Sequence, residues 1–213
     1  ITLSLPPEAF DLSGAERLRP IVELAGSAGL FAFGLGVVML AGEFRHGTIR
    51  QTLLVTPARG RVLAAKLLAA VPVGIAFAVA AVATSLVVGV PWLLLDGIEV
   101  NLADRELLLD VLGNAAAVAL SVPLGVALAA VLRMQSLTVV AYVLWTLFAE
   151  SAVDFVFSEA TPYLIGEALL ALGRSGALAV DPLPMWGAAL VVAGYIAVLA
   201  LLGQRVTLRR DVP

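Results

Sequence analysis

The chain has 213 residues, of which 61% are hydrophobic and only 14% are charged, and its mean hydropathy is +1.03. Soluble domains carry about a quarter charged residues, so this composition excludes an ordinary water-soluble fold and indicates a membrane protein. The formal net charge is −3, with no cysteine and a single histidine, His46. These counts argue against a disulfide framework, a thiol nucleophile and a Cys- or His-rich metal site.

Residues 1–20 are polar and contain three prolines. No basic leader precedes an apolar stretch here, so we expect an outer loop rather than a signal peptide. Five later segments are apolar over enough residues to cross about 30 Å of hydrocarbon, which only helices can do without exposing backbone polar groups to lipid. The predicted spans are residues 21–42, 67–95, 111–132, 137–157 and 186–203. The predicted fold class is therefore an all-α integral membrane bundle.

The segment 158–185, between the last two spans, contains a shorter apolar stretch. Tyr163 to Leu172 is only ten residues long, flanked by Pro162 on one side and Pro182 on the other. Ten residues cannot cross the bilayer as a helix. Two interpretations stay open, an outer re-entrant helix that dips into the membrane or a plain loop helix on the surface.

The distribution of basic residues predicts the orientation, because cytoplasmic loops are enriched in Lys and Arg. Nine of the thirteen basic residues would share one side, namely Arg45, Arg50, Arg59, Arg61, Lys66, Arg133, Arg205, Arg209 and Arg210. That side is predicted to be cytoplasmic, with the loop 43–66 and the tail 204–213 facing inward. Residues 1–20 would then lie outside, and a further span before Ile1 is expected, giving six spans in all.

Small residues recur every four positions in two of the spans. The first span carries Ala28, Ala32 and Gly36 on one face, and the third span has a comparable row made of Ser121, Gly125 and Ala129. Faces of small residues allow helices to approach closely in membranes. We therefore expect close helix packing along these two faces.

The loop 43–66 is the part of the chain richest in functional side chains. The stretch from Glu43 to Val55 is predicted to be helical and to end before Pro57. One helix face would carry four residues at the i, i+3, i+4, i+7 positions, Glu43, His46, Gly47 and Arg50. Gly42 and Gly47-Thr48 have the spacing of a phosphate-binding loop but lack its lysine, so ATP would bind to another subunit.

The order of residues in this loop resembles a known family. The run Glu43-Phe44-Arg45-His46-Gly47-Thr48-Ile49, followed by Thr56-Pro57 and Arg59 and then by Lys66, is similar to the type-2 ABC transporter permeases, closest to actinobacterial-style members. The resemblance implies six spans, a re-entrant helix before the last span, and a cytoplasmic coupling helix that docks on an ATPase subunit. It covers essentially the whole chain except the first span, which would precede Ile1.

Carried onto this sequence, the resemblance implies an ATPase-coupling interface made of Glu43, Phe44, Arg45, His46, Gly47, Thr48, Arg50 and Arg59. It implies ABC ATPase subunits that hold ATP and Mg, a second identical or homologous permease, membrane lipid and no nucleic acid as partners. It places the chain in the bacterial cell membrane, with no catalytic residue, metal or cofactor of its own. The alternative is that these basic residues only set orientation and meet anionic lipid.

Three polar residues within the spans are candidates for a substrate or proton path. Glu150 and Asp154 lie one helical turn apart, and acids inside a membrane are functional candidates by default. Their place near the outer end of the fourth span favours a water-filled mouth instead. Asn114 lies in the third span, where a hydrogen bond within the bundle is the simpler account.

The function predicted on these grounds is the permease subunit of an ATP-driven ABC exporter, with hydrolysis carried out by a separate partner. Two other functions stay open. A proton-coupled secondary transporter would use Glu150 or Asp154, and a non-transporting anchor or assembly subunit would bind a partner through residues 43–66. Neither the transported substrate nor the direction of transport follows from the sequence itself.

Overall fold

The structure is a computed structural model that describes residues 14–48, 54, 58–95, 104–174 and 181–209. Within these ranges the chain is helical, and five stretches are long and apolar enough to cross a membrane. They are Leu18–His46, Gly60–Leu95, Arg105–Leu132, Gln135–Val156 and Met185–Arg205. The five predicted spans are confirmed as apolar helices, although the helices reach beyond the apolar segments at most ends.

Each apolar stretch consists of one long helix or of several shorter helical segments joined end to end. The first stretch consists of α1 (Gly14–Ser27) and α2 (Gly29–His46), and the next two are α4 (Arg59–Leu95) and α5 (Arg105–Leu132). The fourth stretch joins α6 (Gln135–Leu144), the π-helical turn η2 (Trp145–Ala149) and α7 (Glu150–Val156). The 3-10 turn η3 (Ser158–Tyr163) and α8 (Ile165–Leu172) lead to α9 (Met185–Arg209).

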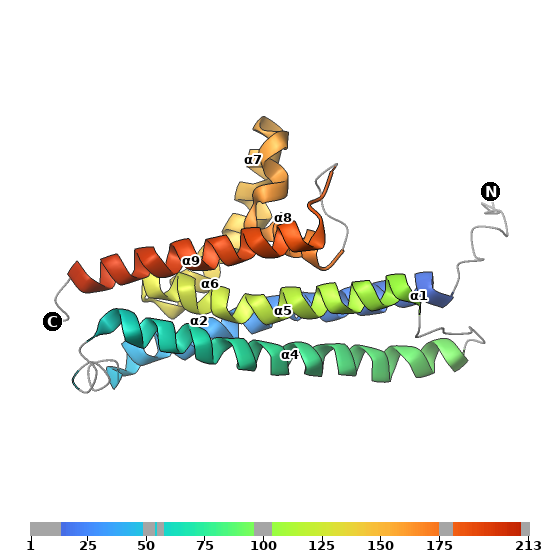
Figure 1. The fold of residues 1–213 in the computed structure, drawn as a ribbon, viewed down its shortest axis with the longest axis horizontal. Coiled ribbons are helices and arrows are strands. Elements are labelled where there is room, and N and C mark those ends of the chain that lie inside the picture. Colours follow the sequence, from blue (N-terminus) through green and yellow to red (C-terminus); the bar gives the residue numbers. More distant parts are fainter. Residues whose placement is uncertain (1–13, 49–53, 55–57, 96–103, 175–180, 210–213) are drawn as a thin grey trace, which may run out of the picture.

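Helix α5 lies at the centre of the bundle. It packs against the α1–α2 pair, α4 and α9, which run alongside it (Figure 1). The buried side chains of α5 are mostly small, including Ala117, Val118, Val122 and Ala129. Their size lets three neighbours approach one helix, because thin side chains bring the helix axes close together. The outward faces of the surrounding helices are apolar, as lipid contact requires.

The predicted close approach of two small-residue faces occurs between α2 and α5. A Cβ added to Gly36 would come within 2.9 Å of the carbonyl carbon of Val122. Gly125 lies equally close on the reciprocal side, where a Cβ would be 3.0 Å from the backbone nitrogen of Val37. Both glycines are required because the two backbones touch at these positions.

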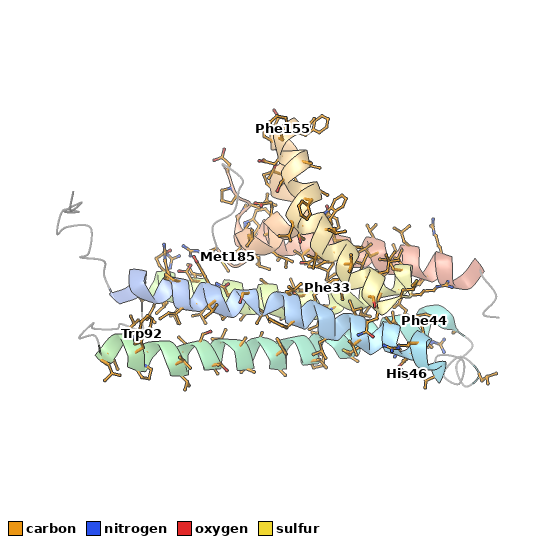
Figure 2. All side chains as sticks on the ribbon, turned by 180° about the vertical axis from the view of Figure 1, so that it is seen from behind. Phe33, Phe44, His46, Trp92, Phe155 and Met185 are labelled. Atoms are coloured by element: carbon orange, nitrogen blue, oxygen red, sulfur yellow. The ribbon has the colours of Figure 1, made fainter. Side chains whose placement is uncertain are left out.

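The two ends of the bundle differ in charge, as the basic-residue pattern predicts. The basic end carries Arg45, Lys66, Arg133 and Arg205, and the ion-pair end carries Arg19, Glu106, Asp110 and Arg174. Figure 2 shows Phe44 and His46 at the basic end and Trp92 at the opposite end. Residues assigned from the sequence to opposite sides of a membrane therefore lie at opposite ends of α5.

The helix formed by α6, η2 and α7 leaves the bundle at a steep inclination to its neighbours, with Phe155 near its tip (Figures 1 and 2). The chain then returns to the bundle. Tyr195, near the middle of α9, donates a hydrogen bond to the carbonyl oxygen of Tyr163 at 3.2 Å. From there α8 follows α9, with Ala168 and Leu172 buried.

This path bears on the two interpretations of the segment 158–185. Helix α8 is packed into the bundle against α5 and α9 rather than lying on its surface. The chain just after α8 reaches the ion-pair end, where Arg174 pairs with Glu106 and Asp110. This packing agrees with the re-entrant interpretation of Tyr163 to Leu172 and not with a helix on the surface of the bundle.

Four charged side chains tie α1, α5 and the end of α8 together at the ion-pair end. Asp110 lies 3.0 Å from the Nε of Arg19 and 3.0 Å from the Nε of Arg174. Arg174 also donates to Glu106 at 2.6 Å. Asp110 is buried and bridges two arginines from different segments, so its charge holds three segments in register.

We expect Asp110→Asn to lower the free energy of unfolding by about 1–3 kcal/mol, because both arginines lose their shared hydrogen-bonded counter-ion. The effect is at the lower end for a buried pair since the Arg19 side chain is 45% exposed. Thermal unfolding of the purified protein in detergent measures it. Asp181→Asn, at an exposed position, is the matched control. Equal unfolding temperatures for the two variants would contradict the bridging role.

Candidate functional site

The last turn of α2 is held from two sides at the basic end. Glu43 accepts a hydrogen bond from Lys66 of α4, which forms an ion pair between the two helices. Phe44 packs against the bundle core, and the guanidinium of Arg133 lies 5.9 Å above its ring. Contacts with both α4 and the end of α5 fix the direction in which α2 ends.

Helix α2 ends at Gly47, which has a φ of +70°. Only glycine takes this conformation without strain, so Gly47 turns the chain sharply at the end of the helix. The residues from Glu43 to His46 are thus the final turn of α2. The prediction that a helical stretch begins at Glu43, after the apolar segment, is wrong at that boundary, because α2 continues without a break through Glu43 and ends at Gly47.

The predicted coupling residues divide into two groups. Glu43 and Phe44 face inward, whereas Arg45, His46 and Thr48 are exposed beside Gly47. The Nδ1 of His46 lies 2.8 Å from the carbonyl oxygen of Gly42 and closes the turn. Arg50 lies outside the described residues. Arg59 begins α4, and its side chain is outside the described part of the chain.

A cavity of about 650 Å³ lies between the α1–α2 pair, α5, the fourth apolar stretch and α8. Its lining combines carboxylates, hydroxyls and apolar side chains. The lining residues are Glu23, Gly26, Ser27, Gly29, Leu30, Asn114, Ala117, Ser121, Tyr142, Val143, Thr146, Leu147, Glu150, Gly166, Glu167, Leu169 and Leu170. The cavity adjoins the ion-pair end at Asn114, which bonds to the backbone of Asp110 and of Gly173, and extends from there past Ser121 and Leu30.

Both interruptions in the helices border this cavity. Between α1 and α2 the backbone nitrogen of Ala28 bonds to Ala25, three residues back, at 3.1 Å. In η2 the backbone nitrogen of Glu150 bonds to Trp145, five residues back. Irregular backbone at membrane depth is tolerated where it lines a protein cavity, and π turns are frequent at functional sites. Because the break at Ala28 and the π turn η2 both border the cavity, the cavity is the second candidate site, after the end of α2.

Glu150 lies inside the bundle, with an exposed fraction of 3%. Its Oε1 accepts a hydrogen bond from the backbone nitrogen of Gly166 at 2.9 Å. The carboxylate thus caps the first turn of α8, where helix N–H groups lack partners. The predicted water-filled mouth is wrong for Glu150, because the return of α8 covers it.

Asn114 and Asp154 have different surroundings. Asn114 is 1% exposed and lines the cavity, and its Nδ2 donates to the carbonyl oxygens of Asp110 at 2.9 Å and Gly173 at 2.8 Å. Asp154 accepts a hydrogen bond from Thr161 at 2.7 Å and is not part of the cavity wall. The structure therefore brings Glu150 and Asn114 together and leaves Asp154 outside the site.

Sequence reasoning missed Glu167, which is 3% exposed and lines the same cavity. The signal was present, because Glu167 is the one charged residue within the apolar stretch from Tyr163 to Leu172. Glu23 also reaches the cavity from α1, where it is exposed. Carboxylates from α1, α7 and α8 therefore border one space.

Searches against protein-family models, curated proteins and solved structures find no match to this chain. The similarity to type-2 ABC permeases stays a prediction that rests on the residues of the loop 43–66.

Proposed function

We propose that this chain is the permease subunit of an ATP-driven ABC exporter in the bacterial cell membrane. The basic end, with the C-terminus, would face the cytoplasm, and a separate ATPase would dock on Arg45, His46 and the residues that follow Gly47. The observation that carries this proposal is the fixed end of α2. Glu43 and Phe44 hold it to α4 and α5, while Arg45 and His46 remain exposed for a partner.

The geometry offers a route for coupling. Helix α2 has 18 residues and is thus about 27 Å long, and it reaches from the basic end to the helix break at Ala28 beside the cavity. A partner that pushes on Arg45 and His46 would move this rod along α5. ATP binding to that partner would then favour one arrangement of the cavity walls over another. A second permease would complete the path.

The proposal is tested by expressing the tagged full-length chain together with the ATPase encoded by the neighbouring gene. Purification through the tag then shows whether the ATPase is recovered with the chain. We expect Arg45→Glu to reduce the recovered ATPase at least tenfold, because it reverses a charge that would fix the register of the partner. The matched control is Arg105→Glu, the same change at a residue 87% exposed at the other end of the bundle. Absence of the ATPase from the wild-type preparation, or equal recovery with both variants, would refute the docking assignment.

The buried carboxylates favour a second candidate, a proton-coupled secondary transporter. Glu150 and Glu167 lie within the apolar bundle beside a cavity, where ionisable residues commonly serve proton relays. Transport by this mechanism would persist without any ATPase and would stop when the proton gradient is collapsed. A non-transporting anchor would bind the ATPase but move no solute, so a vesicle transport assay separates all three.

A further inference from the structure

We propose that the cavity bordered by Glu23, Asn114, Glu150 and Glu167 binds an organic cation that carries a single positive charge on an apolar body. This inference deepens the proposed function, because it rests on the chain being a transporter for the cation to be its cargo. The binding itself needs neither the ATPase nor a gradient. It can therefore be tested apart from transport.

The charges around the cavity favour a cation. Three carboxylates, Glu23, Glu150 and Glu167, border it, and its described lining contains neither Lys, Arg nor His. The basic clusters lie toward the two ends of the bundle, at Arg133 and at Arg174. In a low-dielectric surrounding, a wall with acidic and no basic side chains among its described residues favours a cation over an anion.

Asn114 supplies an independent indication of a ligand. Its side chain is 99% buried, and both of the hydrogen bonds that it forms within the described residues use Nδ2. Its Oδ1 points at Gly26, another residue of the cavity wall, where a Cβ would collide with it. An amide oxygen has two lone pairs, and no hydrogen bond between this oxygen and the described residues is seen. It is suited to accept a hydrogen bond from an ammonium group or to lie against a diffuse positive charge.

The walls and the size of the cavity favour an organic body over a bare ion. Its volume of about 650 Å³ falls within the range of roughly 300–1,000 Å³ of small-molecule sites. Most of the remaining lining is apolar, and Tyr142 adds an aromatic ring, which attracts cations. One carboxylate oxygen of Glu150 already accepts a hydrogen bond from Gly166. The cavity therefore does not surround a bare metal ion with carboxylate oxygens.

The rim of the cavity indicates how the ligand would enter. Leu30, Leu147 and Leu170 line the cavity and are also partly exposed on the surface of the bundle. An apolar rim at this depth opens toward the hydrocarbon of a membrane, not toward water. Amphipathic cations dissolve in that layer, so they would reach the carboxylates sideways between α2 and the fourth apolar stretch.

Two ions of nearly the same shape and opposite charge provide the test. Saturable binding of tetraphenylphosphonium and of tetraphenylborate is measured by equilibrium dialysis on the purified full-length chain in detergent. We expect the phosphonium to bind and the borate not to compete. The double variant Glu23→Gln with Glu150→Gln should raise the phosphonium Kd by roughly tenfold or more. The amide introduced by Glu150→Gln keeps an oxygen for the backbone nitrogen of Gly166, so the cap of α8 is preserved.

Glu159→Gln, at an exposed position on η3 outside the cavity, is the matched control and should leave the phosphonium Kd unchanged. If the double variant does not fold, Glu23→Gln alone and the comparison of the two ions on the wild type still decide the matter. Equal affinity for both ions, no saturable binding, or an unchanged Kd in the variants would overturn the cation site. If the cation binds but no ATPase co-purifies, the proposed function is overturned and the cation site is kept. If the ATPase co-purifies but the cation does not bind saturably, the cation site is overturned and the proposed function is kept.

Discussion

Gly36→Val is expected to yield little folded protein, whereas Gly34→Val, two residues earlier in the same helix, is expected to fold. At Gly36 a Cβ would overlap the backbone of Val122, and a backbone cannot move aside as a flexible side chain can. Helix α2 would have to withdraw from α5 along its length. The cost is expected at the upper end of the roughly 1–3 kcal/mol typical of overpacking, or above it.

Gly34 is a close control because it differs only in what surrounds it. A Cβ there would meet no atom within 4 Å, and the exchange of glycine for a side chain improves helix propensity. Detergent-extracted yield of monodisperse protein, followed by the temperature of unfolding, measures both variants. Gly125→Val should behave like Gly36→Val, since its own Cβ would meet the backbone of Phe33 and Val37. Similar yields for the variants at Gly34 and Gly36 would contradict the backbone contact.

Glu43→Lys is expected to abolish ATPase co-purification without any contact between Glu43 and the ATPase. The substitution places two ammonium groups beside each other, because Glu43 pairs with Lys66. Repulsion between them would displace the final turn of α2 and with it the exposed Arg45 and His46. The predicted role of Glu43 as a direct contact and the structural role seen here therefore give the same result in a single variant.

The exchange Glu43→Lys with Lys66→Glu separates these two roles. If Glu43 acts by holding α2 to α4, the exchange restores the ion pair and should restore most of the co-purification. Arg45→Glu should gain nothing from the change at Lys66, because Arg45 is exposed and takes no part in that pair. If the exchange fails to restore binding while the protein remains folded, Glu43 contacts the partner directly.

The apolar helices were predictable because hydropathy is a local property of about twenty residues. Close packing at Gly36 and Gly125 was also predictable, since spacing alone places both on small-residue faces, but the sequence did not say that these two faces contact each other. The ends of the helices were less predictable from the sequence. Helix α2 continues through Glu43 to His46, because its hydrogen bonds end at Gly47 rather than where the apolar residues end.

The cavity was not predictable because it depends on where distant segments meet. Glu150 is buried only because α8 returns to it, 16 residues later, and no pattern near Glu150 encodes that return. The ion pair of Glu43 with Lys66 spans 23 residues and is equally non-local. The break at Ala28 has no proline beside it, and a sequence rich in Gly and Ala permits such breaks at many places.

The π turn η2 sets which side chain of the fourth apolar stretch meets α8. A hydrogen bond that spans five residues instead of four accommodates one more residue than an α-helical turn. If the same residues formed regular α-helix instead, the extra residue would be taken up as rotation, and everything after Ala149 would turn by about 100°. Glu150 would then turn away from Gly166 although the hydropathy of the stretch had not changed at all. A relative of this chain that lacks one residue here could form regular α-helix through the stretch and still carry its carboxylate on the same face.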